Sequence, residues 1–238
     1  MKYYSQYKQD YLIDFLFSKK QNGFFLDIGA HDGISFSNSY FFEKYRGWKG
    51  ICIEPNPVVF EKLKINRNCV LENCCISSEE GNVVFRKVSG YAEMLSGILD
   101  FFDDEHIERI NQEISLYGGS YQDISVKSKK LNQILGKNQV YNIDYCSIDT
   151  EGAELEIIKS LDFEKYNIVA FSIEGSNAEV TLYLKNKGYK CVMSMCDSFY
   201  VKRDHNNFSV FYLMMKSYIL TTKTKNLRLF KWLKNKFS

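Results

Sequence analysis

The chain has 238 residues, of which 45% are hydrophobic, and its 31 Lys and Arg side chains nearly balance its 29 Asp and Glu side chains. This composition excludes a disordered chain, a collagen-like repeat and a small disulfide scaffold, and the length suits one large domain with an extension. The longest apolar runs are far shorter than the ~20 residues that span a bilayer, and residues 1–4 lack the apolar block of a signal peptide. We therefore expect a cytoplasmic protein.

The charge is unevenly distributed along the chain. Residues 216–238 contain seven basic side chains and no acidic one, which leaves residues 1–215 with 24 basic and 29 acidic side chains, a net charge of −5. We therefore divide the chain into a domain at 1–215 and a basic tail at 216–238. The acidic body argues against a nucleic-acid partner, because nucleic-acid enzymes usually place basic side chains around their cleft.

The tail is amphipathic as well as basic. Near-helical spacing is found for its apolar residues Leu227, Phe230, Leu233 and Phe237. Such a segment can attach to an anionic membrane surface, or it can pack on a protein partner or on the acidic body of the same chain. The oligomeric state does not follow from the sequence.

Along the chain, short apolar runs alternate with helical patterns, as is typical of βαβ units and a mostly parallel sheet. The expected elements are an opening helix within 5–20, a strand at 24–28, a helix at 38–45, a strand at 50–53, a helix at 57–64, a strand at 69–72, a hairpin strand at 83–88, a strand at 145–148, a helix at 153–161, a strand at 168–173, a helix at 178–186, and final strands at 189–195 and 209–213. A segment at 89–122, with a charged helix at 103–114, interrupts this alternation after the third strand, and we interpret it as an inserted lid or acceptor wall. The expected fold is α/β with helices on both faces of the sheet.

The strand at 24–28 leads into a turn with two glycines, Gly29 and Gly33, in the sequence Gly-Ala-His-Asp-Gly. Glycines four residues apart allow a tight turn and can leave backbone N–H groups free for an anionic ligand. The dinucleotide fingerprint Gly-x-Gly-x-x-Gly is absent, which disfavours NAD and favours S-adenosylmethionine, whose methionine carboxylate needs a smaller cradle. An ordinary strand-to-helix turn is the alternative.

An acid follows the next strand. Glu54 lies 25 residues after Gly29, close to the ~20-residue separation that places a carboxylate on a ribose diol in related folds. Pro55 and Pro57, the only prolines of the chain, stiffen the backbone beside Glu54. Taken alone, Glu54 is typical of a surface acid, but together with the glycine turn it predicts a ribose-binding carboxylate.

Several separated motifs resemble, in order, the FkbM family of S-adenosylmethionine-dependent methyltransferases. They are Ser-Gln-Tyr-Lys-Gln-Asp at 5–10, the strand and glycine turn at 24–33, Phe-Ser-Asn-Ser-Tyr at 36–40, Gly-Trp-Lys-Gly-Ile-Cys-Ile-Glu-Pro at 47–55, Cys-Ile-Ser at 75–77, Ser-Ile-Asp-Thr-Glu-Gly-Ala-Glu at 147–154 and Ile-Glu at 173–174. The resemblance covers nearly all of residues 5–213. It implies a class I methyltransferase (Rossmann-like) fold with a mostly parallel seven-stranded sheet. It also implies O-methylation of a hydroxyl on a sugar, glycan or related polyhydroxylated acceptor.

The resemblance also implies roles for individual residues. The implied cofactor-binding residues are Gln6, Asp27, Gly29, Ala30 and Gly33, with Glu54 as the ribose acid and Cys75 and Ile76 as the adenine wall. His31 occupies a position where such loops often have Asn. It can face the methionine end of the cofactor as a catalytic residue, or local hydrogen bonds can hold it. A non-catalytic scaffold or glycan-binding domain on the same fold is the alternative to an enzyme, because a fold does not by itself establish an activity.

Acidic residues follow two later strands. Asp149 and Glu151 come after the strand at 145–148, and Glu174 ends the strand at 168–173. Parallel sheets bind ligands outside the carboxyl ends of their strands, so these acids are expected near the cofactor. Any of them can be the general base that removes the proton of the attacking hydroxyl, with Asp149 as the first choice. Alternatively, Asp149 and Glu174 can bind a divalent cation such as Mg²⁺, or the acids at 151 and 154 can stabilise the start of a helix.

The two other histidines are expected at the surface. His205 follows a predicted loop at 197–204, where we expect a solvated side chain beside Asp204, and His106 lies in the inserted helix. The seven cysteines include no Cys-x-x-Cys pair, and no histidine lies at metal-ligand spacing from them. This pattern argues against both a zinc site and a disulfide framework.

Overall fold

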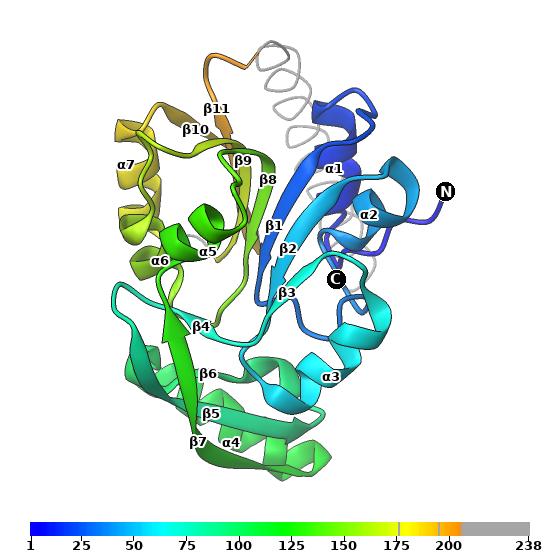
Figure 1. Ribbon diagram of the computed structural model, residues 1–238. Coiled ribbons are helices and arrows are strands. Elements are labelled where there is room, and N and C mark those ends of the chain that lie inside the picture. The colour runs from blue at the N-terminus through cyan, green and yellow to red at the C-terminus, as the bar shows by residue number, and fades with distance from the viewer. Residues whose placement is uncertain (176, 195, 206–238) are drawn as a thin grey trace, which may run out of the picture.

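The computed structural model describes residues 1–175, 177–194 and 196–205, and a seven-stranded sheet lies at its centre (Figure 1). The strands are β1 (Phe24–Ile28), β2 (Lys49–Ile53), β3 (Val70–Glu72), β8 (Asn142–Ile148), β9 (Asn167–Glu174), β10 (Tyr189–Ser194) and β11 (Asp197–Lys202). Their order is β10-β11-β9-β8-β1-β2-β3, and β11 runs antiparallel to both of its neighbours while the other pairs are parallel. The predicted fold class, a mostly parallel seven-stranded sheet of the class I methyltransferase type, is confirmed.

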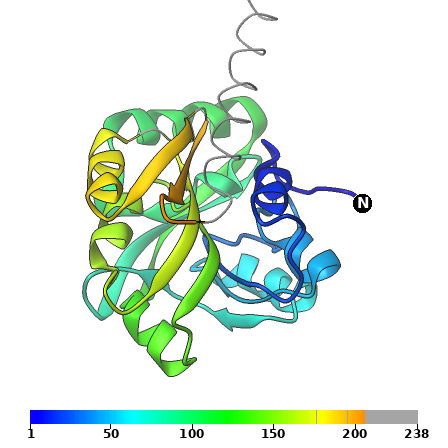
Figure 2. The same ribbon diagram turned by 90° about the horizontal axis from the view of Figure 1, so that it is seen from above.

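Helices cover both faces of this sheet (Figures 1 and 2). One face is covered by α1 (Gln9–Leu16), α2 (Tyr40–Arg46) and α3 (Pro57–Asn66), and the other by α5 (Leu131–Lys137), α6 (Glu154–Ser160) and α7 (Ala178–Asn186). Because side chains alternate along a strand, Phe25 of β1 packs in the first core and Leu26 in the second. No helix in the described ranges has both the length and the apolar composition that crossing a membrane requires.

The carboxyl ends of four adjacent strands lie level with one another. Ile28 of β1 pairs with Ile53 of β2 and with Ile148 of β8, and Ile148 pairs in turn with Ile173 of β9. The residues that follow these four are Gly29, Glu54, Asp149 and Glu174. The parallel register therefore places all four of them at one edge of the sheet, as the sequence predicted.

The end of the sheet differs from the prediction. The segment 197–204, predicted as a loop, contains β11, which forms a hairpin with β10 and pairs with β9. Its residues Phe199, Tyr200 and Val201 are buried, so both faces of this strand contact the core. An unbroken buried run lacks the alternation by which a strand is usually recognised, which is why this one was missed. The strand predicted at 209–213 and the tail at 216–238 lie outside the described residues.

The segment between β3 and α5 forms a second, smaller sheet, seen below the main one in Figure 1. Its strands are β4 (Cys75–Ile76), β5 (Gly81–Gly90), β6 (Gly97–Ile98) and β7 (Gly119–Lys129), in the order β4-β7-β5-β6, and the helix α4 (Asp104–Tyr117) and two short 3₁₀ turns (Glu93–Leu95 and Leu99–Phe101) accompany them. The predicted inserted helix is therefore present, but the predicted lid at 89–122 is part of a sheet and not purely helical. The long strand β7 was missed because most of its residues are polar and exposed.

A buried ion pair fixes α1 on α2. The Arg46 guanidinium donates to the Asp14 carboxylate from Nε at 2.6 Å and from Nη2 at 2.7 Å, and both side chains are at most 5% exposed. Tyr3 donates a further hydrogen bond to Asp14. Paired hydrogen bonds from a planar guanidinium hold both groups in one geometry. Loss of either partner would leave the other charge buried without compensation.

We expect Arg46→Ala to lower the free energy of unfolding by about 3–5 kcal/mol, because a buried carboxylate loses its partner. The matched control is Lys64→Ala, since Lys64 pairs with Glu61 on the exposed surface of α3 and such a pair contributes at most about 1 kcal/mol. Urea unfolding followed by circular dichroism measures both variants. Equal effects of the two substitutions would contradict the role of the buried pair.

Candidate active site

A pocket of about 340 Å³ opens at the level carboxyl ends of β1, β2, β8 and β9. This volume is within the range of small-molecule sites. The predicted site residues that line it are Gln6, Asp27, Gly29, Ala30, His31, Glu54, Cys75, Ile76, Asp149, Glu151 and Glu174. Gly33 is the one predicted site residue that does not line it.

The turn after β1 passes directly over the end of β8. Gly29 has φ +85°, and a Cβ atom at this position would lie 1.7 Å from the Asp149 carbonyl oxygen. The N–H groups of Gly29 and Ala30 both donate to the Ile53 carbonyl oxygen, and that of Gly33 donates to Ala30. The expectation that these glycines leave backbone N–H groups free for an anion is therefore wrong at these positions. Gly29 is required because the two chain segments approach too closely for a side chain.

Gly33 makes room for a buried arginine. A Cβ atom at Gly33 would lie 2.6 Å from side-chain atoms of both Arg67 and Leu63. Arg67 donates to the Gly33 carbonyl oxygen at 3.2 Å and to Ser39 Oγ at 2.9 Å, and Ser39 Oγ donates in turn to the Asp27 carboxylate. Gly33 is thus packed against Arg67 and lies outside the pocket lining.

Glu54 is held with both carboxylate oxygens in place. Its side chain is buried, Oε2 accepts from the His31 N–H at 2.9 Å, and Oε1 accepts from the Asn56 N–H at 2.8 Å. Burial raises the pKa of Glu54 to about 7, and the two backbone hydrogen bonds oppose this rise. Each oxygen keeps a further lone pair, so the carboxylate can accept from two adjacent hydroxyl groups of a ligand.

The pocket has an apolar end beside Glu54. Cys75 and Ile76 of β4 line it together with Phe85 of β5 and Ile98 of β6. All four side chains are buried. Apolar walls of this kind are typical of sites that bind a flat apolar group such as a nucleobase, and the adenine wall at Cys75 and Ile76 stays a prediction.

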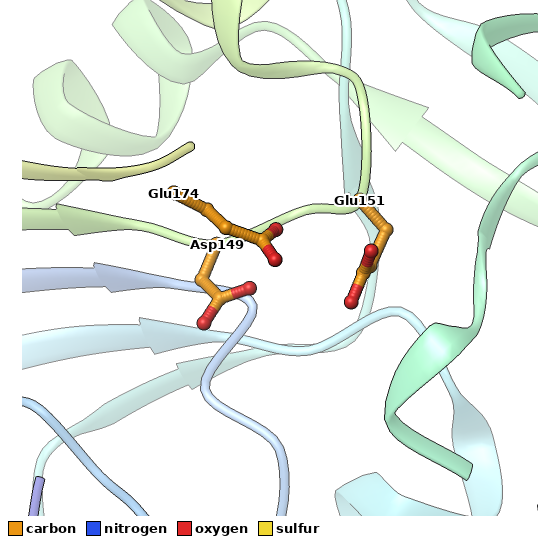
Figure 3. Close-up of side chains that lie close together, drawn as sticks. All are labelled: Asp149, Glu151 and Glu174. Atoms are coloured by element: carbon orange, nitrogen blue, oxygen red, sulfur yellow. The ribbon is translucent and has the colours of Figure 1, made fainter. Parts of the chain in front are cut away.

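Three carboxylates gather at the other end of the pocket (Figure 3). Asp149 and Glu174 lie side by side, Glu151 faces them, and one oxygen of each lies within 4.8 Å of the others. Asp149 is open to the pocket but enclosed by protein on its other sides, and this burial, with the charges of Glu174 and Glu151, raises its pKa well above the ordinary value. Burial and the charge of Glu174 raise the pKa of Glu151 to about 8. Burial also raises the pKa of Glu174.

The turn that bears Glu151 has an unusual backbone conformation. Glu151 has φ +55°, a left-handed conformation that is strained for a residue with a side chain and that concentrates at functional sites. The Glu154 carboxylate holds this turn by accepting from the N–H groups of Thr150 at 3.0 Å and Gly152 at 3.1 Å. Glu154 therefore has the helix-start role that the sequence left open, whereas Glu151 lines the pocket.

His31 connects the turn after β1 to the second sheet. Its Nε2 lies 3.1 Å from Glu93 Oε1, and Lys62 Nζ lies 3.2 Å from the same oxygen. The ring is thus held through Nε2, whereas Nδ1 has no hydrogen-bond partner among the described residues, so both alternatives for His31 stay open. His31 also has a left-handed backbone, with φ +48°, and lines the pocket.

The expectation of surface positions for the other histidines is wrong. The His106 side chain is 14% exposed, its Nε2 lies 3.0 Å from the Leu95 carbonyl oxygen, and its Nδ1 lies 3.5 Å from Glu151 Oε2. His205 packs against the Phe17 ring, and partial burial lowers its pKa. Neither contact was predictable, because each joins segments that are far apart in the chain.

The sequence analysis assigned no site role to several other polar lining residues, among them Gln9, Arg109 and Asp197. Gln9 donates to the Asp197 carboxylate at 2.5 Å, and Arg109 of α4 faces the acids from the second sheet. Gln9 lies inside the motif at 5–10, but nothing in that motif indicates a partner 188 residues away. The position of Arg109 depends on how the inserted segment folds over the pocket, and no sequence pattern predicts that arrangement.

The chain matches the family model described as "Methyltransferase FkbM domain" over residues 27–191. The chain belongs to the FkbM methyltransferase family. The matched residues include Glu54 and the three acids at the far end of the pocket. The chemistry of this family is the transfer of a methyl group, for which S-adenosylmethionine is the implied donor.

Two curated relatives are also methyltransferases by name. "Methyltransferase sdnD" of Sordaria araneosa is 26% identical over 196 residues, which are 71% of this chain and 74% of the relative. "Methyltransferase 1" of Beauveria bassiana (strain ARSEF 2860) is 23% identical over 199 residues, which are 74% of this chain and 76% of the relative.

Similar solved structures include the METTL16 methyltransferase domain, with a TM-score of 0.40 and 14% identity over 80% of this chain. This chain spans 64% of the length of that domain. Precorrin-6y C5,15-methyltransferase from Geobacter metallireducens GS-15 has a TM-score of 0.40 and 12% identity over 82% of this chain and 86% of that chain.

The pKa of Glu54 predicts how stability depends on pH in the absence of ligand. As pH rises from about 4.5 to about 7, Glu54 releases its proton in the unfolded chain before it does so in the folded one, so the free energy of unfolding falls across this window. We expect Glu54→Gln to reduce this slope, while Glu61→Gln, at an exposed position of α3, leaves it unchanged. Urea unfolding at a series of pH values measures the slope. An unchanged slope in Glu54→Gln would contradict the raised pKa.

Proposed function

We propose that this FkbM-family methyltransferase uses S-adenosylmethionine to methylate a hydroxyl group of a sugar, glycan or related polyhydroxylated acceptor. The observation that favours this function most is the position of Asp149, Glu151 and Glu174. These acids lie in the same pocket as Glu54, and burial raises the pKa of each of them. One pocket therefore has a nucleoside-binding half and a half suited to proton uptake.

The residues of the nucleoside half suit the adenine and the ribose of the donor. The apolar walls at Cys75 and Ile76 suit the adenine ring, and the fixed oxygens of Glu54 suit the two ribose hydroxyls. When bound, S-adenosylmethionine supplies an electrophilic methyl group on a sulfonium centre. Because Glu54 and Asp149 follow level positions on β2 and β8, a nucleoside held by Glu54 places its 5′ substituent toward the acids.

The acid half can accept the proton of the acceptor. Methyl transfer to a hydroxyl joins the oxygen to the methyl carbon, leaves the electron pair of the broken carbon–sulfur bond on sulfur, and requires a base for the hydroxyl proton. Asp149 is the proposed base, because its raised pKa makes it a better proton acceptor than an ordinary aspartate. Asp149 and Glu174 are close enough to titrate as a pair, so either carboxylate can hold the transferred proton.

A polyhydroxylated acceptor suits the walls of this half. Asp197, Gln9 and Arg109 line it beside the three acids and add both hydrogen-bond donors and acceptors. Carboxylates accept hydrogen bonds from several hydroxyl groups at once, as sugars present them. The acceptor is therefore proposed to be bound through its hydroxyl groups.

The same acids can hold a divalent cation such as Mg²⁺. Hard cations prefer oxygen ligands, and a bound cation would lower the pKa of the acceptor hydroxyl. Asp149 and Glu174 would then be ligands and not bases. We propose the base role for Asp149, and removal of divalent cations distinguishes it from the ligand role.

The first test is donor binding. We expect the protein to bind S-adenosylhomocysteine in calorimetry, and Glu54→Ala to lose two hydrogen bonds to a charged group, each worth about 1.5–3 kcal/mol. Val58→Ala, an exposed residue on the neighbouring α3, is the control and should bind like wild type. Equal binding by wild type and Glu54→Ala would contradict the assignment of the nucleoside half.

The second test separates donor binding from catalysis. We expect Asp149→Asn to keep the affinity for S-adenosylhomocysteine within a few-fold and to lower turnover by about 10²–10⁴, the usual contribution of a general base. Methyl transfer to a panel of nucleotide sugars and oligosaccharides is measured by the mass gain of one methyl group. Glu164→Gln, an exposed acid outside the pocket, is the control.

The same assay distinguishes base from metal ligand. Activity that persists in a strong chelator supports the base role, and activity that is lost in chelator and restored by Mg²⁺ reassigns Asp149 as a ligand. Unchanged turnover in Asp149→Asn would remove it from both roles.

A further inference from the structure

Two pocket-lining residues have a buried side-chain atom with no hydrogen-bond partner among the described residues: His31 at Nδ1 and Asn38 at Oδ1. An amide oxygen can only accept, so the Asn38 atom specifies a hydrogen-bond donor on the ligand. Asn38 is 8% exposed and lines the pocket, and its Nδ2 donates to Ser147 Oγ at 2.9 Å. Within the described part of the chain, its Oδ1 accepts no hydrogen bond. Leaving a buried acceptor unsatisfied costs about 1–3 kcal/mol, so such an atom calls for an explanation. A ligand that donates a hydrogen bond in this place explains it.

The amide of Asn38 contacts one end of a buried chain of hydroxyl groups. Tyr145 and Ser172 hydrogen-bond to each other, Ser172 Oγ donates to Ser147 Oγ at 3.4 Å, and Ser147 accepts the Asn38 Nδ2. The Nδ2 end of the amide therefore belongs to this chain of hydroxyl groups. The Oδ1 end is the one left for a ligand.

A buried carboxylate lines the same pocket and is linked to both neighbours of this amide. Asp27 is the register partner of Ser147, and it accepts from Ser39, the residue that follows Asn38. Asp27 is 4% exposed and lines the pocket, and no ion pair to it is found among the described residues. Arg67 reaches it only through Ser39. A cation beside Asp27 would offset the cost of burying this charge.

The location in the sheet indicates which part of a ligand reaches Asn38. The adenine wall and Glu54 lie on the β2 side of β1, whereas Asn38 is attached to Ser147 on β8, the opposite neighbour of β1. A nucleoside held by Glu54 thus extends its 5′ substituent across β1 toward Asn38 and Asp27. In the proposed donor, that substituent carries an amino acid with a protonated amine.

We propose that Asn38 is a binding residue for the ammonium group of the methionine moiety, which donates to Asn38 Oδ1 and lies against Asp27. An ammonium has three donors and one positive charge, and therefore satisfies both the unpartnered oxygen and the buried carboxylate. A neutral hydroxyl would donate to the Asn38 oxygen but would not compensate the charge of Asp27. This inference rests on the proposed function, because it assumes that the pocket holds the donor.

Calorimetry with three probes tests the inference on the full chain. S-adenosylhomocysteine has both the ammonium and the carboxylate, its desamino analogue lacks only the ammonium, and 5′-methylthioadenosine lacks the whole amino acid. We expect Asn38→Ala to weaken binding of S-adenosylhomocysteine by about tenfold or more, as for loss of a hydrogen bond to a charged group. The affinities for the two other probes should stay within about twofold of wild type, since a twofold change is well below the loss of one such hydrogen bond.

Two further variants make the result decisive. Asn38→Asp keeps the shape and the acceptor, so it should retain the wild-type preference for S-adenosylhomocysteine over the desamino analogue. Ser35→Ala is the control, because Ser35 also lines the pocket but its Oγ already donates to Asp32. An equal loss for all three probes in Asn38→Ala, or no loss for any, would overturn the inference, as would a lost preference in Asn38→Asp. A wild-type protein that binds none of the probes would instead refute donor binding itself.

Discussion

The close approach of Gly29 to the Asp149 carbonyl oxygen is the constraint on which the site depends. It requires a residue without a side chain at the end of β1, and the hydrogen bond from the Asp149 N–H to the Ile28 carbonyl oxygen closes the contact at 3.0 Å. Gly29 and Ala30 are tied to β2 in the same way through Ile53. Three strand ends are therefore held together at one point, and Glu54 and Asp149 are placed on either side of it.

Around this point the protein buries more negative charge than its fold needs. Asp27 and Glu54 are buried, and the cluster of Asp149, Glu151 and Glu174 has raised pKa values because burial and mutual repulsion disfavour its ionised forms. Such an arrangement opposes stability, and proteins retain it where a ligand or a reaction requires it. Arg109 is a cationic lining residue, and a ligand with a sulfonium and an ammonium group would add further positive charge beside these acids.

The second sheet completes the pocket and does not merely cover it. Glu93 contacts His31 at the nucleoside half, and His106 lies beside Glu151 at the acid half. Both contacts join the insertion to residues with left-handed backbone conformations. The insertion thus helps to hold the two strained turns that line the pocket.

The sequence was sufficient for most of the fold because the strands at 24–28 and 168–173 and the helix at 178–186 have strong local patterns. Glu54 and Asp149 could be placed at one sheet edge because parallel register follows from the βαβ order. The features that the sequence did not predict depend on contacts between segments that are far apart in the chain. The burial of β11, the contact of Gly33 with Arg67 and the position of His106 against Glu151 arise from packing between distant segments.

The unpartnered Oδ1 of Asn38 was also not predictable from the sequence. Asn38 is part of the motif at 36–40, but whether its oxygen has a hydrogen-bond partner depends on the groups that surround it in the folded protein. The packing of Gly29 against Asp149 and of Gly33 against Arg67 was likewise invisible in the sequence, where the two glycines indicated only a turn.

A crystal structure of the protein with S-adenosylhomocysteine would show which groups hold the donor. We expect the adenine ring against Cys75 and Ile76, both ribose hydroxyls on the Glu54 carboxylate, and the sulfur directed toward Asp149. A ligand bound elsewhere, or one in this pocket whose ribose does not contact Glu54, would contradict this expectation.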